Sequence, residues 1–174
     1  SRFDGDAYAR SGQAELGGRL LRAPMLSIHT VAAGGGSILA FDGERVRVGP
    51  RSAGADPGPA CYGRGGPPAV TDANVVLGRI QKDWFPKVFG PDNDGPLDVE
   101  AARAALSELA KAMGAESTEA AAEGFLAVAV EAMAEAIKQI SIGQGVDPRG
   151  YALNAFGGAG GQHACKVAEA LGMT

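Results

Sequence analysis

Glycine gathers in three places along the chain, and the first of them ends in a hydroxyl side chain. This first glycine cluster reads Gly34-Gly35-Gly36-Ser37 and is followed by the apolar run 38–41. Bare backbone N–H groups in such a loop can cradle phosphate oxygens, with the Ser37 hydroxyl as one more donor. The same residues are also typical of a glycine-rich turn or β-bulge. The local pattern leaves both interpretations open.

The last glycine cluster, Gly157-Gly158-Ala159-Gly160-Gly161, lies between an apolar run at 151–156 and residues 162–171, which have helical periodicity. A strand, a glycine turn and a helix start direct backbone N–H groups and the positive end of a helix dipole to one spot. This favours close approach of the backbone to adenosine or phosphate, with Gly158 at a positive φ. The alternative is close packing of the helix on the strand. A dinucleotide-binding turn fits less well, because GxGxxG would place its last glycine at His163.

Asp72 is the candidate catalytic residue, in the run Thr71-Asp72-Ala73-Asn74. Its carboxylate is suited to holding Mg²⁺ through water or to orienting a nucleophile, but Thr71 or Asp72 is equally suited to capping a helix that begins at Ala73. No Cys/His/Asp group has the spacing of a metal site, so no direct metal ligand is expected. Of the two histidines, His29 is expected to be structural, and His163 is a candidate for contact with a ligand.

The sequence predicts both strands and helices around these residues, which indicates an α/β fold, with α+β as the alternative. An Asp42-Gly43 turn between apolar runs predicts a hairpin over 38–48. The Gly/Pro loop, residues 49–68, is too rich in glycine and proline for regular structure, and we expect an ordered loop rather than a linker. Strands are predicted at 15–22, 25–31 and 151–156, and helices at 73–79, 97–113, 118–142 and 162–171.

Composition excludes several classes of protein. The chain has 174 residues, a net charge of -4 and a hydrophobic fraction of 45%. The negative charge argues against a nucleic-acid partner, and no apolar run reaches the roughly 20 residues of a membrane span. Two distant cysteines, Cys61 and Cys165, are typical of reduced thiols in a cytoplasmic protein. Because the chain opens at Ser1 without an initiator Met, we expect an excised piece: a single partial domain over residues 1–174.

Five unusual motifs occur in one order, and together they resemble the hydantoinase A / 5-oxoprolinase family, which includes ketone carboxylase subunits. The resemblance covers roughly residues 15–172. One departure is Gly161, where the family pattern has proline. The motifs are Ala33-Gly34-Gly35-Gly36-Ser37-Ile38, Gly49-Pro50-Arg51-Ser52-Ala53-Gly54-Ala55, Pro57-Gly58-Pro59-Ala60-Cys61-Tyr62-Gly63, Thr71-Asp72-Ala73-Asn74 and Phe156-Gly157-Gly158-Ala159-Gly160.

The resemblance implies one lobe, the C-terminal one, of an actin/hexokinase-like ATPase fold, with a mixed sheet and packed helices. It implies ATP as cofactor, held by Gly34–Ser37 and Gly157–Gly160, with Mg²⁺ bound through the nucleotide. The implied activity is ATP-dependent hydrolysis of a lactam or cyclic imide, of the hydantoin or 5-oxoproline type, by phosphorylation of the carbonyl oxygen.

Two alternatives remain open. Within the family, a ketone carboxylase subunit has the same motifs. The alternative outside the family is a dinucleotide-binding module or a non-catalytic interaction module. The family implies a small-molecule cyclic amide or ketone as substrate and a hydantoinase B-like subunit or domain as partner. An N-terminal region beyond this chain is expected to supply another phosphate loop and an acidic residue, so the fragment alone is expected to be inactive.

Overall fold

The structure is a computed structural model that describes residues 1–3 and 5–173. The helices within these residues are α1 (Val70–Val76), α2 (Val99–Met113), α3 (Thr118–Ile140) and α4 (Ala164–Ala170). The strands are β1 (Arg10–Ser11), β2 (Ala14–Leu16), β3 (Arg19–Leu21), β4 (Met25–Leu26), β5 (Ser37–Phe41) and β6 (Val46–Ser52). The predicted α/β class is confirmed, but the described strands pair as three two-stranded antiparallel sheets, β1–β4, β2–β3 and β5–β6, rather than as one mixed sheet.

The β5–β6 hairpin is the one that the Asp42-Gly43 turn predicts. The Asp42 carboxylate accepts hydrogen bonds from the N–H groups of Glu44 (3.1 Å) and Arg45 (2.8 Å), which fixes the turn. Strand β6 continues to Ser52, which lies opposite Ser37 across a shift in register. The prediction of irregular backbone from residue 49 onward is therefore wrong for residues 49–52, because the irregular register accommodates a Gly-Pro pair at the edge of the sheet.

Helices α2 and α3 confirm the sequence prediction, and each begins at a capping side chain. The Asp98 carboxylate accepts from the N–H of Ala101 at 2.9 Å, and the Ser117 hydroxyl accepts from the N–H of Ala120 at 3.0 Å. Gly114, with a φ of 65°, ends α2 in the left-handed conformation. None of the helices in the described residues combines the length and the hydrophobicity that crossing a bilayer requires.

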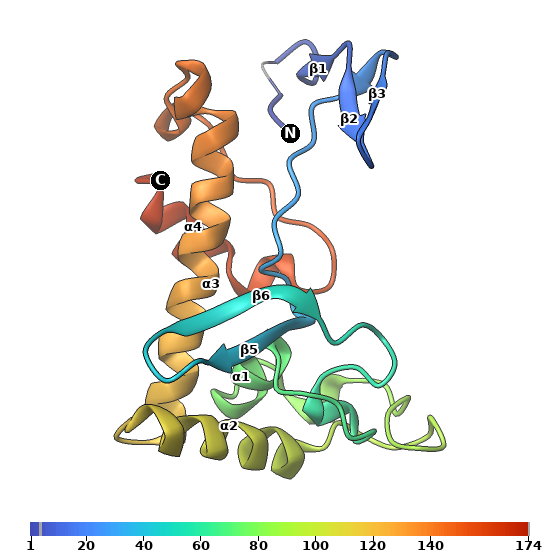
Figure 1. Ribbon diagram of the computed structural model, residues 1–174, viewed down its shortest axis with the longest axis vertical. Coiled ribbons are helices and arrows are strands. Elements are labelled where there is room, and N and C mark those ends of the chain that lie inside the picture. The colour runs from blue at the N-terminus through green and yellow to red at the C-terminus, as the bar shows by residue number, and fades with distance from the viewer. Residues whose placement is uncertain (4, 174) are drawn as a thin grey trace.

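The main core lies where α1 packs between α2, α3 and the hairpin (Figure 1). Phe125 and Leu126 of α3 and Leu106 of α2 are completely buried there. A smaller cluster joins α4 to the side of α3 through Val130, Ala134, Val167 and Leu171. Burial of this apolar surface is the main force that holds the helices and the hairpin together.

The N-terminal strands differ from the prediction. Residues 15–22 are not one strand but two, β2 and β3, which turn at Gly17 and Gly18, both at positive φ. Only Met25–Leu26 of the predicted strand 25–31 is in a sheet. In Figure 1 these strands lie at the end of the molecule opposite α2. Two adjacent glycines form a tight turn more readily than a strand interior, which explains the break at residue 17.

The predicted strand at 151–156 is wrong for the described residues: this segment is irregular, and Phe156 is 84% exposed. An apolar run forms a strand only where a neighbouring strand pairs with it, and none of the described strands pairs with this segment. The predicted helix that follows is confirmed as α4, but it begins at Ala164, after a short 3-10 turn at Gly160–Gln162.

Candidate functional site

The first turn of α1 holds the first glycine cluster. Thr71 donates two hydrogen bonds to the carbonyl oxygen of Gly35, one from its backbone N–H and one from its hydroxyl, each of 2.9 Å. A methyl group on Gly35 would lie 2.8 Å from the Thr71 hydroxyl oxygen, and one on Gly36 would lie 2.9 Å from the Ser52 hydroxyl oxygen. The glycines at 35 and 36 are therefore required by close packing inside the chain.

Ser37 closes this cluster as a turn. Its backbone N–H donates to the carbonyl oxygen of Gly34 at 2.9 Å, and the residue is 6% exposed at the start of β5. These contacts give the cluster the structural role of a turn leading into the hairpin. A phosphate contact by Gly34, Gly35, Gly36 or Ser37 stays a prediction.

Asp72 binds the Gly/Pro loop to α1. One carboxylate oxygen accepts from the N–H of Cys61 at 2.7 Å, and the other accepts from the N–H groups of Ala60 (3.1 Å) and Ala69 (2.7 Å). The side chain has no exposed surface. Burial raises the pKa of Asp72, while the hydrogen bonds from Cys61, Ala69 and Ala60 act in the opposite direction. The helix begins at Val70, so Asp72 lies in its first turn rather than before it.

Asn74 connects α1 to the last glycine cluster. Its side-chain nitrogen donates to the carbonyl oxygen of Val70 at 3.2 Å and lies 3.5 Å from Nε2 of His163, which follows the 3-10 turn. Asn74 is completely buried and His163 is 2% exposed. Burial lowers the pKa of His163, and the positive charge of Arg79 lowers it further. His163 is therefore an interior side chain rather than an exposed one, in surroundings that favour its neutral form.

The first and last glycine clusters meet at α1. A methyl group built on Gly35 would lie 3.5 Å from the methyl carbon of Ala159, in the middle of the last cluster. Thr71, Asp72 and Asn74, all within α1, thus each contact a different glycine-rich segment. In Figure 1 the turn before α4 lies beside the β5–β6 hairpin, as this meeting requires. The structure thus brings Gly35 of the first cluster close to Ala159 of the last one, whereas Asp72 is buried.

The last glycine cluster is the open part of this site. Side chains built on Gly158, Gly160 and Gly161 would meet no atom within 4 Å. The positive φ expected at Gly158 is wrong; it belongs to Gly157, at 87°. Within the described residues the N–H groups of Gly157 and Gly158 have no partner. Packing inside the chain therefore does not explain glycine at positions 158, 160 and 161. Open space beside a glycine backbone is expected where that backbone faces a ligand.

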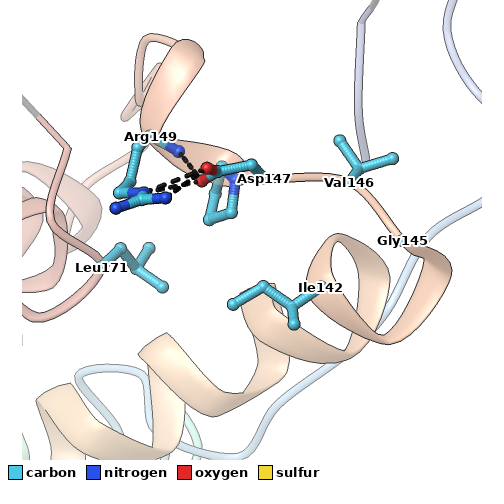
Figure 2. A pocket seen from close by; sticks show the side chains of 7 residues that line it. Ile142, Gly145, Val146, Asp147, Arg149 and Leu171 are labelled. Carbon is cyan, nitrogen blue, oxygen red and sulfur yellow. Dashed lines mark hydrogen bonds and ion pairs between the residues drawn. The ribbon is translucent and has the colours of Figure 1, made fainter.

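Two hollows lie elsewhere on the surface. One, of about 400 Å³, lies between the end of α3 and α4, where Asp147 and Arg149 face each other and form a close ion pair (Figure 2). Hydrogen bonds from Arg149 lower the pKa of Asp147 to about 2. The other, of about 560 Å³, lies among β1, β2 and β4. Neither is lined by the glycine clusters.

Neither metal ligation nor thiol chemistry is supported by the side chains of this region. No group of three or more His, Cys, Asp or Glu side chains in the described residues is arranged to hold a metal ion. Burial and the adjacent Asp72 charge raise the pKa of the Cys61 thiol, so it stays protonated. Cys61 is thus part of the core and not a nucleophile.

Sequence reasoning missed the linking roles of Thr71 and Asn74. The signal was present in the run 71–74, in which a hydroxyl, a carboxylate and an amide occur within four residues of a short helix. At 100° per residue, Thr71 and Asn74 lie on nearly the same face of the helix, one turn apart, and Asp72 lies on another face. The sequence alone does not show which glycine-rich segment each of these side chains contacts.

Comparison with known proteins agrees with the sequence motifs. The hydantoinase/oxoprolinase family model matches residues 1–174. The 5-oxoprolinase 1 of Arabidopsis thaliana is 47% identical over 184 residues, which is 99% of this chain and 14% of the relative. The crystal structure of the ATP-dependent caprolactamase of Pseudomonas jessenii superposes with a TM-score of 0.76 at 42% identity, over 88% of this chain and 22% of that one.

A nucleotide-free structure of acetone carboxylase superposes with a TM-score of 0.79 at 25% identity, over 95% of this chain and 23% of the other. The chain thus spans less than a quarter of the length of each of these relatives. The order of the glycine motifs, the shared architecture and the match along the whole chain agree: this chain belongs to the hydantoinase/oxoprolinase family.

Proposed function

We propose that this chain is part of a longer ATP-dependent amidohydrolase, and that it contributes one side of the nucleotide site. The observation that carries the proposal is the meeting of two glycine clusters at α1, of which the last is open and has unpartnered N–H groups. The relatives supply the class of reaction, since they include a 5-oxoprolinase and an ATP-dependent caprolactamase. The proposed substrate is a lactam or cyclic imide of the 5-oxoproline or hydantoin type.

The need for ATP follows from the stability of the amide. Resonance makes the ring C–N bond inert, and transfer of the terminal phosphoryl group to the carbonyl oxygen turns that oxygen into a leaving group. Water then attacks the carbonyl carbon, and the C–N bond breaks as the ring nitrogen takes up a proton and leaves. A second water hydrolyses the resulting acyl phosphate, which releases inorganic phosphate and the ring-opened amino acid. A protein contributes to phosphoryl transfer mainly by positioning and by neutralising charge. The proposal therefore requires fixed N–H donors and not a reactive side chain.

The residues of this chain fit such a role. In this proposal the N–H groups of Gly157 and Gly158 donate to phosphate or adenosine oxygens, and the nucleotide approaches through the open space beside Gly158 and Gly160. Gly34, Gly35, Gly36 and Ser37 are proposed to contribute beside them, since Gly35 approaches Ala159 of the last cluster. Asp72 is proposed as a positioning residue, because its carboxylate is buried and engaged by three backbone N–H groups.

Other parts of the proposal concern the complete protein. Mg²⁺ is proposed to bind through the phosphates of ATP, since the described side chains form no metal cluster. A hydantoinase B-like subunit or domain is proposed as the partner. The chain itself is proposed to form the C-terminal lobe of an actin/hexokinase-like ATPase fold. A cytoplasmic location is supported by the free cysteines, the buried Cys61 and the exposed Cys165.

A ketone carboxylase subunit is the second candidate function. It is favoured by the superposition on acetone carboxylase, which covers 95% of this chain. In that case the phosphorylated oxygen would be that of a ketone or bicarbonate, and a new C–C bond would replace hydrolysis. The last glycine cluster would bind ATP in the same way in both reactions.

The test is turnover by the full-length protein. It is incubated with Mg-ATP and with 5-oxoproline, hydantoin, caprolactam or acetone plus bicarbonate, and ADP release is followed. The proposal expects ADP release that depends on one of the cyclic amides, matched by ring-opened product. ADP release only with acetone and bicarbonate would select the carboxylase. Absence of ADP release with every substrate would contradict both.

A further inference from the structure

The contact between Asn74 and His163 joins two segments that are far apart in the sequence. Asn74 lies in α1, one turn after the residue that holds Gly35, and His163 lies two residues after the last glycine cluster, at the end of the 3-10 turn. Both side chains are buried, and neither is used in the function proposed above. Burial of a polar side chain costs free energy unless the side chain is hydrogen-bonded. A buried polar pair between α1 and the turn before α4 therefore indicates a specific role.

The hydrogen bonds of Asn74 fix the roles of both side chains. Only the amide nitrogen can donate to the carbonyl oxygen of Val70, at 3.2 Å, so this nitrogen is the atom that faces His163. Nε2 of His163, 3.5 Å away, must then accept, and the ring proton must be on Nδ1. The contact exists only for a neutral imidazole, because a protonated ring presents N–H groups at both nitrogens.

Two atoms of the pair remain without partners among the described residues, Oδ1 of Asn74 and Nδ1 of His163. A single amide-to-ring contact is therefore the only side-chain hydrogen bond that fixes the imidazole within these residues. Loss of that contact would leave the ring with none, and the preceding turn Gly160–Gln162 would lose its anchor on α1. The last glycine cluster then has less to hold it beside Gly35.

The charges around the ring disfavour its protonation. The positive charge of Arg79, which follows α1, opposes protonation of the imidazole. The Arg79 guanidinium bonds Glu123 of α3 at 2.8 Å, and Glu123 also bonds Lys166 of α4 at 3.3 Å. These ion pairs connect the end of α1 to α3 and α4. The Glu123 carboxylate is thus engaged by two cations, and the charge that acts on the imidazole is the positive one of Arg79.

We propose that Asn74 and His163 are a positioning pair, which sets the last glycine cluster against the first and does so only while His163 is neutral. The inference rests on the proposed function, in that the cluster so positioned is taken to bind ATP. Acid protonation of His163 breaks the contact, loosens the turn and weakens nucleotide binding.

The experiment measures the dissociation constant of Mg-ATP for the full-length protein between pH 5 and pH 8 by calorimetry. In the wild type, affinity should fall about five- to tenfold on the acid side, the effect of losing one buried hydrogen bond. His163→Gln keeps an uncharged acceptor near the position of Nε2, so it should bind as the wild type does at neutral pH and lose this acid-side step. His163→Phe fills the same space without an acceptor and should bind weakly at every pH.

His29→Gln is the matched control, because His29 is the other histidine of the chain and lies exposed outside this pair. It should keep the acid-side step, and protonation of ATP itself is common to all four proteins. A step of the same size in His163→Gln would overturn the proposal, as would wild-type affinity in His163→Phe. A step that vanishes in His29→Gln would also overturn it.

A second readout separates this inference from the proposed function. If no variant binds ATP, the proposed function fails, but the nitrogen chemical shifts of the His163 ring still report on the pair. The pair predicts a neutral ring protonated at Nδ1, and a change of the Nε2 shift in Asn74→Ala. A ring protonated at Nε2, or shifts that are unchanged in Asn74→Ala, would contradict the pair whatever happens with ATP.

Discussion

The carbonyl oxygen of Gly35 accepts two hydrogen bonds from Thr71, one from the backbone N–H and one from the hydroxyl, each of 2.9 Å. A short helix thereby fixes a glycine loop that precedes it by more than thirty residues. The same helix reaches the Gly/Pro loop through Asp72 and the last glycine cluster through Asn74.

Removal of the Thr71 hydroxyl should weaken the first link but not abolish it. Thr71→Val keeps the shape of the side chain and the backbone N–H bond, so the free energy of unfolding should fall by about 1 kcal/mol. Thr71→Ser keeps the hydroxyl and should remain within about 0.5 kcal/mol of the wild type. Denaturant unfolding measures both. Equal stabilities of the two variants would show that the hydroxyl bond to Gly35 contributes nothing.

Two neighbouring glycines should respond differently to a methyl group. In Gly35→Ala the new carbon lies 2.8 Å from the Thr71 hydroxyl oxygen, whereas in Gly34→Ala it meets nothing within 4 Å. We expect Gly35→Ala to lower the free energy of unfolding by about 1–3 kcal/mol and Gly34→Ala to change it by less than about 0.5 kcal/mol. The reverse order in thermal or denaturant unfolding would be incompatible with the packing described here.

Asp72→Asn should destabilise the protein, contrary to what a simple capping role predicts. An amide nitrogen in place of one carboxylate oxygen would face backbone N–H groups, donor against donor, in a buried site. The free energy of unfolding should fall by about 1–3 kcal/mol. Asp56→Asn, an exposed change in the same Gly/Pro loop, is the control and should leave stability unchanged. A stable Asp72→Asn protein with greatly reduced turnover would instead restore a catalytic role for the carboxylate.

Stability should fall on mild acidification because of His163. Its pKa in the folded protein lies below the ordinary 6.5, so below that pH the unfolded chain binds a proton that the folded one does not. The contribution is therefore complete above pH 6.5 and is lost as the pH falls toward the folded pKa. Unfolding of the wild type and of His163→Gln between pH 5 and 8 isolates this effect from the carboxylates. Parallel curves for the two proteins would mean that His163 does not contribute.

The sequence predicted those elements whose determinants are local. The helices α2 and α3 follow from apolar periodicity and from the caps Asp98 and Ser117, and the β5–β6 hairpin follows from Asp42-Gly43. The strand predicted at 151–156 is absent because a strand also needs a partner, which no local pattern supplies. The tight turn at Gly17 and Gly18 was overlooked within an otherwise apolar run.

The site was predictable as a set of motifs but not as an arrangement. Glycine content identified the three segments, yet the reasons for glycine differ: close packing at Gly35 and Gly36, a positive φ at Gly157, and open space at Gly158. Residue type alone does not separate these causes. The roles of Thr71 and Asn74 depend on contacts across 36 and 89 residues of sequence, which only the fold brings about.

The most direct measurement is calorimetric titration of Mg-ATP into the full-length protein with Gly158→Val, beside Gly12→Val as control. Both glycines have an ordinary φ, and a side chain at either meets no atom within 4 Å, so neither change should lower the melting temperature. If the last glycine cluster faces the nucleotide, Gly158→Val should raise the dissociation constant at least about tenfold, a loss of about 1.4 kcal/mol, and Gly12→Val should leave it unchanged. Wild-type ATP affinity in a folded Gly158→Val protein would contradict the account.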